Sequence, residues 1–231
     1  MERNGELRVL RIISQSGPKC VFDIGANTGE WSQLFAKMNP SCFIHAFEIV
    51  PSTFEDLLRS TKDLGNVIPI NLGLSDKEES ISISLGNDSS MATGCKIEGM
   101  KSHNEYYSEE IKCQVKKASD YMIEKNLQYI DFVKIDVEGM DLKVIKGFED
   151  LLRNVRALQF EYGIFNISSH DLLADFCRHL TEKEFLVGKI FPKHVKFFDY
   201  HFNMENFHGS NYVAVRADER ELVKQLQQYG A

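Results

Sequence analysis

Short apolar runs alternate with amphipathic segments through most of this 231-residue chain, and the alternation limits the folds open to it. Strand patterns are expected at 20–24, 43–47, 67–74, 130–137 and 155–162. Apolar residues at helical spacing follow most of these runs, and strands that alternate with helices form a parallel sheet covered on both faces. The sequence therefore predicts one α/β domain over residues 1–231, with an N-terminal helix within 1–17.

Two parts of the chain depart from this alternation. Period-two apolar residues at 81–85 and 111–115 predict an inserted antiparallel hairpin. The joining segment 86–110 is too long for a turn, so we expect a lid loop there or a disordered insertion. Strands at 185–191 and 212–216, with no helix between them, predict an antiparallel edge to the sheet.

Composition narrows the classes of partner. The net charge is −7 and the basic residues form no stripe, so we expect no nucleic-acid partner, because phosphate binding favours a positive face. Five scattered cysteines without a CxxC pair favour a reducing compartment, which predicts a cytoplasmic protein. No apolar run approaches the roughly 20 residues of a membrane span. The oligomeric state leaves no signal in the sequence.

A glycine-containing turn from Asp23 to Gly29 follows the first predicted strand. Ligands of doubly wound sheets bind at the carboxyl ends of the strands, where glycine lets backbone approach closely. A dinucleotide fingerprint needs glycines at 25, 27 and 30, but Asn27 and Glu30 occupy two of these positions. The carboxylates of Asp23 and Glu30 disfavour a pyrophosphate and favour a cationic ligand such as S-adenosylmethionine. Asp23, Gly25, Asn27 and Gly29 are therefore candidate cofactor-binding residues.

Acidic residues also end the next two strands. Glu48 ends the second, where a carboxylate can accept both hydrogen bonds of a ribose diol. Ser75 and Asp76 follow the third, in a loop expected to face an adenine, and they can equally begin an ordinary turn. We predict that Glu48, Ser75 and Asp76 bind the cofactor.

Asp136 and Glu138 end the fourth strand, directly before a helix. Both can project into the cleft that the first three motifs share. The alternative is a helix N-terminal cap, a role that Asp141 can also fill.

The region from Val21 to Tyr162 resembles the FkbM family of methyltransferases. The resemblance rests on Phe22-Asp23-Ile24-Gly25-Ala26-Asn27-x-Gly29, Ala46-Phe47-Glu48, Leu74-Ser75-Asp76, Lys134-Ile135-Asp136-Val137-Glu138-Gly139 and Gln159-Phe160-Glu161-Tyr162. One departure is Ile49-Val50 before Pro51, because the family usually has proline directly after the glutamate. The resemblance implies a Rossmann-like seven-stranded sheet with S-adenosyl-L-methionine as cofactor. It also implies O-methylation of a hydroxyl on a sugar, glycan or polyketide-like small molecule.

A neutral hydroxyl is a weak nucleophile, so a general base is expected to accelerate such a transfer by about 10²–10⁴-fold. Asp136, Glu138 and Glu161 are the candidates, and we favour Asp136 and Glu138. Asp136 can instead hold the methyl donor, and Glu161 can orient the acceptor. The three could also bind a divalent cation, but their spacing fits no defined metal motif and we predict no metal.

Three alternatives stay open. The chain can be a non-catalytic module that kept a cofactor-binding fold. It can also be a nicotinamide-dependent oxidoreductase, which the missing second glycine disfavours. Separately, the aromatic segment 191–210, which includes His194, His201 and His208, can line an acceptor pocket or only pack at the sheet edge.

Overall fold

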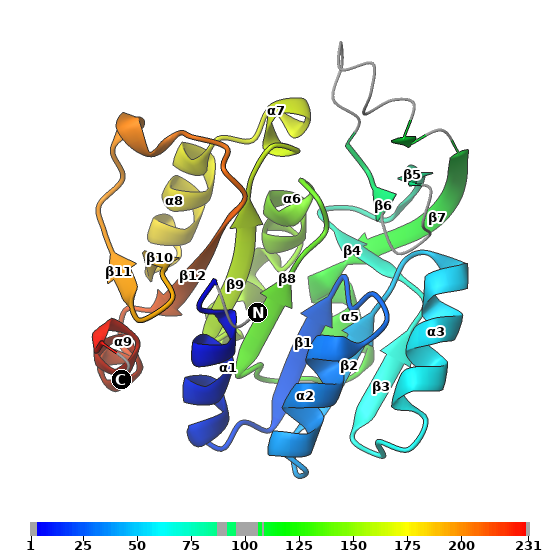
Figure 1. Cartoon of the computed structure of the whole chain (residues 1–231), viewed down its shortest axis with the longest axis horizontal. Coiled ribbons are helices and arrows are strands. Elements are labelled where there is room, and N and C mark those ends of the chain that lie inside the picture. Colours follow the sequence, from blue (N-terminus) through cyan, green and yellow to red (C-terminus); the bar gives the residue numbers. More distant parts are fainter. Residues whose placement is uncertain (1–3, 87–91, 96–105, 108, 230–231) are drawn as a thin grey trace.

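A sheet of strand order β11-β10-β12-β9-β8-β1-β2-β3 forms the middle layer of the molecule (Figure 1). The computed structural model describes residues 4–86, 92–95, 106–107 and 109–229. Neighbours from β3 through β9 pair in parallel, and β12, β10 and β11 continue the sheet antiparallel. The strands are β1 (Cys20–Ile24), β2 (Phe43–Phe47), β3 (Val67–Ile70), β8 (Phe132–Ile135), β9 (Ala157–Tyr162), β10 (Phe185–Ile190), β11 (Val195–Phe197) and β12 (Ser210–Arg216).

This arrangement confirms the predicted α/β class with its antiparallel edge. We expected seven strands, and the sheet has eight. The additional strand is β11, only three residues long, which pairs with β10 at the outer edge.

Helices cover both faces of the sheet and enclose two apolar cores. The two cores follow from strand alternation: Val21 of β1 packs into one, and its neighbour Phe22 packs into the other. One face carries α1 (Glu6–Gln15), α2 (Glu30–Met38), α3 (Pro51–Thr61) and α9 (Arg220–Gln227). The other carries α5 (Ala118–Glu124), α6 (Asp141–Lys146) and α8 (Leu173–Glu182). The chain also forms the short α7 (Asn166–Ser169) and the 3-10 turns η1 (Glu149–Asn154) and η2 (Phe202–Met204).

A second, four-stranded sheet lies beyond the carboxyl ends of the central strands, at the upper right of Figure 1. Its order is β4-β7-β5-β6, with β4 (Gly73–Ser75), β5 (Glu79–Leu85), β6 (Ala92–Thr93) and β7 (Glu109–Lys117). The predicted hairpin is confirmed, because β5 and β7 pair antiparallel. The predicted single strand 67–74 is wrong: the chain leaves the central sheet after Ile70 and pairs with β7 from Gly73. At the break, the Asn71 side-chain amide donates to the carbonyl oxygen of Glu48 at 2.8 Å.

Most of the expected lid loop, 86–110, lies outside the described residues. Of its described part, β6 pairs with β5 through Ser84 and Thr93, and Glu109 and Glu110 already belong to β7. No helix within the described ranges is long and apolar enough to cross a bilayer.

Candidate functional site

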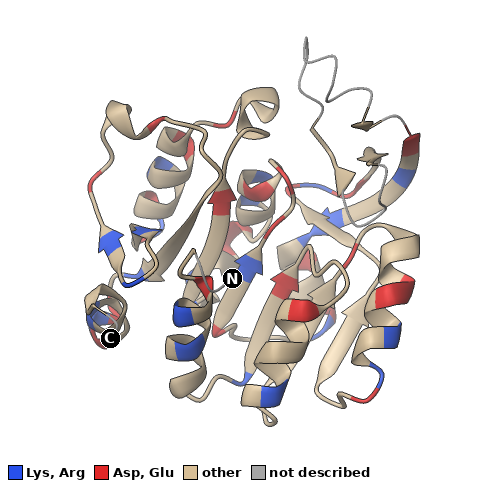
Figure 2. Cartoon of the chain, viewed as in Figure 1, with Lys and Arg blue, Asp and Glu red and all other residues tan. Residues whose placement is uncertain are grey.

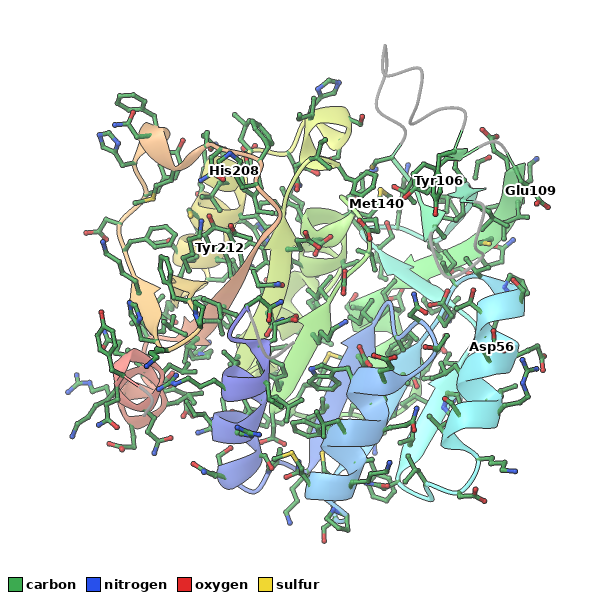
Figure 3. All side chains as sticks on the ribbon, in the orientation of Figure 1. Asp56, Tyr106, Glu109, Met140, His208 and Tyr212 are labelled. Atoms are coloured by element: carbon green, nitrogen blue, oxygen red, sulfur yellow. The ribbon has the colours of Figure 1, made fainter. Side chains whose placement is uncertain are left out.

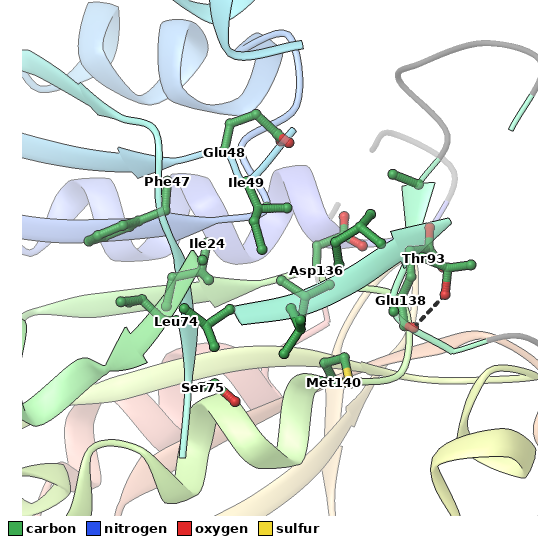
Figure 4. A pocket seen from close by; sticks show the side chains of 18 of the residues that line it. Ile24, Phe47, Glu48, Ile49, Leu74, Ser75, Thr93, Asp136, Glu138 and Met140 are labelled. Atoms are coloured by element: carbon green, nitrogen blue, oxygen red, sulfur yellow. Dashed lines mark hydrogen bonds between the residues drawn. The ribbon is translucent and has the colours of Figure 1, made fainter. Parts of the chain in front are cut away.

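A cavity, here called the first cavity, lies where the carboxyl ends of β1, β2 and β8 meet the second sheet (Figure 4). Its wall is apolar toward the second sheet, where Ile81, Ile83 and Val115 lie, and carries carboxylates toward β2 and β8. The residues that line it are Ile24, Gly25, Asn27, Phe47, Glu48, Ile49, Thr53, Leu72, Gly73, Leu74, Ser75, Ile81, Ile83, Ala92, Thr93, Gly94, Val115, Asp136, Val137, Glu138 and Met140.

The turn after β1 brings backbone to the edge of this cavity. Gly25 has φ +79°, and a Cβ atom on it would lie 1.9 Å from the carbonyl oxygen of Asp136, so only glycine fits there. Asn27 has φ +52°, and its N–H donates to Glu48 Oε2 at 2.9 Å. The turn is therefore held between the ends of β8 and β2.

Glu48 is only 6% exposed at the end of β2. Its Oε1 atom accepts the Val50 N–H at 2.8 Å, while Oε2 accepts from Asn27. Burial raises the pKa of Glu48, and the hydrogen bonds from Val50 and Asn27 oppose that rise. A carboxylate has about four lone-pair sites, and the backbone N–H groups of Val50, Asn27 and Ile49 all stabilise the charge of this one, so capacity for a ligand hydroxyl remains.

Of the seven predicted cofactor-binding residues, four line the first cavity: Gly25, Asn27, Glu48 and Ser75. Gly29 is instead the N-cap of α2 with φ +86°, and a Cβ atom there would lie 2.7 Å from Leu57 Cδ1. Asp76 lies outside the cavity wall and accepts the Ser75 hydroxyl at 3.3 Å.

Asp23 lies beneath the turn and is fully buried. Its Oδ2 atom accepts the Ser32 hydroxyl at 2.7 Å, and Oδ1 lies 3.4 Å from Lys134 Nζ. The Lys134 ammonium also bonds Asp136 Oδ2 at 3.2 Å. Figure 2 shows acidic positions on β1 and β9 on either side of a basic position on β8, the strand between them. The charge of Asp23 is thus neutralised inside the fold.

A second cavity adjoins the first, and among the described residues Glu138 alone lines both. Met140, which lines the first cavity, and His208, which lines the second, both lie in the upper half of the molecule in Figure 3. The second cavity is lined by Glu138, Gly139, Glu161, Gly163, Ile164, Phe165, Asn166, Phe207, His208 and Gly209.

The carboxyl groups of Asp136, Glu138 and Glu161 line the two cavities at their junction. The Asp141 carboxyl is fully buried and acts electrostatically on Glu138, and Lys134 pairs with Asp136. Burial, and then the nearby carboxylate of Asp136, raise the pKa of Glu138 to about 8 and that of Glu161 to about 7. Burial also raises the pKa of Asp141 to about 7, although the Glu161 N–H that donates to its Oδ1 opposes this. Like charges so close cannot all ionise, so Glu138, Glu161 and Asp141 share protons near neutral pH.

The backbone of Glu138 is unusual for a residue with a side chain. Its φ is +51°, in the left-handed region, and Gly139 follows with φ +93°. The Thr93 hydroxyl of β6 lies 3.2 Å from the Glu138 carbonyl oxygen and can donate to it (Figure 4). Strained conformations of this kind persist where the surroundings hold them, often at functional sites.

Asp136 and Glu138 line the first cavity, and Glu138 and Glu161 line the second, at the edge of the sheet expected from the sequence. Lys134 had no role in that expectation. The signal was a lysine inside the otherwise apolar run 132–135, which predicts a buried ammonium with acidic partners. Asp141 is also not the helix cap: Met140 is, and Asp141 Oδ1 accepts from Glu161. Of the aromatic segment 191–210, Phe207 and His208 reach the second cavity. The described residues contain no group of three His, Cys, Asp or Glu placed to hold a metal ion.

Comparison with known proteins relates this chain to a family of methyltransferases. The sequence resembles the 2-O-methyltransferase NoeI of Sinorhizobium fredii, with 23% identity over 68% of this chain and 68% of that protein. It is 30% identical to the hexuronic acid methyltransferase AglP of Haloferax volcanii over 65% of this chain and 59% of that protein. The matched regions span 58–68% of the length of the curated relatives.

Among solved structures, the O-methyltransferase TomG of Streptomyces achromogenes has the same fold. Its TM-score is 0.50 at 10% identity, over 92% of this chain and 78% of that one. The profile of the methyltransferase FkbM domain matches residues 23–187, which carry the glycine turn, Glu48, Ser75 and the carboxylates of both cavities. The chain belongs to the FkbM methyltransferase domain family.

Proposed function

We propose that the chain is an S-adenosylmethionine-dependent O-methyltransferase that modifies a hydroxyl of a sugar-like small molecule. One observation carries the proposal. The glycine turn and Glu48 line one cavity, and Glu138 at its far side also lines a second cavity. A methyl donor and an acceptor in adjoining cavities would meet at Glu138. Family membership supports the reaction class.

The residues of the first cavity fit this cofactor. Glu48 keeps acceptor capacity for a ribose hydroxyl, and Phe47, Ile49 and Leu74 supply an apolar wall for an adenine. The carboxylates of Asp136 and Glu138 suit its two cationic groups, the ammonium and the sulfonium. When bound, the cofactor supplies an activated methyl group.

The chain itself then has two tasks. The second cavity must hold the acceptor hydroxyl in line with the methyl group, and such positioning can contribute up to about 7–11 kcal/mol. A carboxylate must also remove the hydroxyl proton. Glu138 and Glu161 both line the second cavity, and either carboxylate can take that proton when ionised.

Two relatives support a sugar acceptor, because their names describe a 2-O-methyltransferase and a hexuronic acid methyltransferase. Phe165 and Phe207 beside two carboxyl groups give the second cavity the mixed apolar and polar wall that a sugar ring requires. The net charge of −7 supports a small molecule or glycan over nucleic acid as the partner. The five cysteines are free, which supports a cytoplasmic location.

The first expected result is that S-adenosylhomocysteine binds and that NAD and NADP do not. Neither the turn at Gly25 nor the acidic wall suits a pyrophosphate. Titration calorimetry with the three ligands measures this directly. Tight NAD binding, with no response to S-adenosylhomocysteine, would instead assign the chain to the oxidoreductases. Incubation with labelled methyl donor and a panel of monosaccharides then separates an enzyme from a non-catalytic module.

Replacing Glu48 should affect both binding and folding. Glu48→Ala should weaken S-adenosylhomocysteine binding by about 1.5–3 kcal/mol, the range for a charge-assisted hydrogen bond. Glu48 is also buried and accepts hydrogen bonds from the backbone N–H groups of Val50 and Asn27. The variant should therefore also lose about 1–3 kcal/mol of unfolding free energy, measured in urea. Glu48→Gln, which keeps one acceptor oxygen, should lose less stability. Unchanged affinity in Glu48→Ala would remove the ribose role.

A further inference from the structure

The junction of the two cavities contains more acidic groups than its lysine can neutralise. Glu138 is faced from several elements by titratable or charged side chains. Within the described part of the chain these are Lys134 on β8, Asp136 directly after β8, Asp141 on α6, Glu161 on β9, Tyr107 before β7 and His208 before β12. Lys134 is already paired, with Asp23 and Asp136. In the free protein, carboxyl groups at this junction must therefore carry protons.

Glu138 is the carboxyl group most affected. Burial and the neighbouring acids raise its pKa to about 8, so that at pH 7 most molecules hold a proton there. Its position is fixed by the left-handed backbone at φ +51° and by the Thr93 contact to its carbonyl oxygen. Because Glu138 lines the first cavity as well as the second, its carboxyl group is exposed to the charge of a cofactor bound in the first cavity.

We infer that Glu138 distinguishes the methyl donor from its product by charge: it is protonated in the free protein and releases that proton when the sulfonium binds. This inference rests on the proposed function. S-adenosylmethionine brings a sulfonium cation, whereas S-adenosylhomocysteine has a neutral thioether at the same position. A positive charge about 5 Å from a carboxyl lowers its pKa by about two units at an effective dielectric constant near 20.

The charge of the junction then stays balanced through a reaction cycle. With the methyl donor bound, an ionised Glu138 faces a sulfonium. In the transfer, the acceptor oxygen forms its bond to the methyl carbon while the electrons of the carbon–sulfur bond remain on sulfur. The acceptor O–H bond breaks, and its proton passes to the Glu138 carboxylate. A neutral carboxyl group and a neutral thioether remain, and the product therefore lacks the charge attraction that held the methyl donor.

The test measures protons rather than turnover, so it needs no acceptor. S-adenosylmethionine and S-adenosylhomocysteine are titrated into the full chain at pH 7, in buffers of low and high ionisation enthalpy. The methyl donor should release about 0.5–0.9 proton more than its product, from the protonated fraction expected at that pH. The ratio of the two affinities should also shift at least tenfold in favour of the methyl donor between pH 6 and pH 8. The sign follows because the methyl donor binds the ionised form of Glu138, which increases with pH.

Variants identify the group. In Glu138→Gln the excess proton release and the pH dependence of the affinity ratio should disappear, whereas Glu182→Gln, an exposed change at the end of α8, should keep both. Equal proton release by the two ligands in the unmodified chain would overturn the inference, even if the glutamine variant does not fold. So would an excess that persists in Glu138→Gln. Failure of both ligands to bind would overturn the proposed function instead, and the inference with it.

Discussion

Replacing Lys134 with methionine should lower the free energy of unfolding by about 3–5 kcal/mol, the usual cost of removing one partner of a buried ion pair. The ammonium is almost buried and lies 3.4 Å from Asp23 Oδ1. Asp23 is fully buried, and the Ser32 hydroxyl is the hydrogen-bond partner of its other oxygen. Asp136, the second partner of Lys134, has a side chain that is 43% exposed and can be hydrated instead. Most of the lost stability should therefore come from leaving the Asp23 carboxylate buried without a counter-ion.

Urea unfolding followed by circular dichroism measures this loss. Lys183→Met is the matched control, because Lys183 pairs with an Asp150 side chain that is 88% exposed, and such surface pairs contribute about 0–1 kcal/mol. The double variant Lys134→Met/Asp23→Asn should recover at least half of the loss, since removing both charges leaves no buried ion unpaired. A loss in Lys134→Met no larger than in the control would mean that the buried pair does not stabilise the fold.

Most strands of the central sheet could be predicted because each has a recognisable local sequence pattern. Runs such as 20–24 and 43–47 are apolar at four of their five positions, as expected of strands covered on both faces, and they appear in the structure within the predicted bounds. The end of the third strand could not be predicted, because the apolar pattern from Val67 to Leu74 continues across the point where the chain passes from one sheet to the other. That change depends on contacts with β7, more than 35 residues later in the chain, which no local pattern records.

The site was predicted in outline for a similar reason. Parallel strands end at one edge, so residues after β1, β2 and β8 had to approach one another, and Gly25, Glu48 and Asp136 do line one cavity. The direction in which each side chain points was harder to predict from the sequence. Asp23 precedes Gly25 by two residues, yet it faces the α2 side and bonds Ser32. The adjacency of the second cavity depends on the loop before β12, which folds back beside β9 from a distant part of the chain.

Glu138→Gln should reduce kcat by about 10²–10⁴-fold, the contribution typical of a general base, once the monosaccharide panel has supplied an acceptor. Glutamine keeps the size of the side chain but cannot accept a proton. Because S-adenosylhomocysteine carries no sulfonium, its affinity should stay within about threefold of the unmodified chain. Glu161→Gln should mainly raise KM for the acceptor, since Glu161 lines the second cavity but not the first.

The pH profile separates a base from a residue that only shapes the cavity. A base acts when ionised, and burial and its acidic neighbours hold the pKa of Glu138 near 8 in the free protein. The value of kcat/KM for the methyl donor, which reports on the free protein, should therefore rise with pH up to about 8 and level off above it. This rise should be absent in Glu138→Gln. With the methyl donor bound, the sulfonium favours the ionised form, so the corresponding rise in kcat should occur at lower pH than the rise in kcat/KM. If kcat in Glu138→Gln stays within threefold of the unmodified chain, the proton is removed by another group, and Glu161 is then the carboxylate to replace.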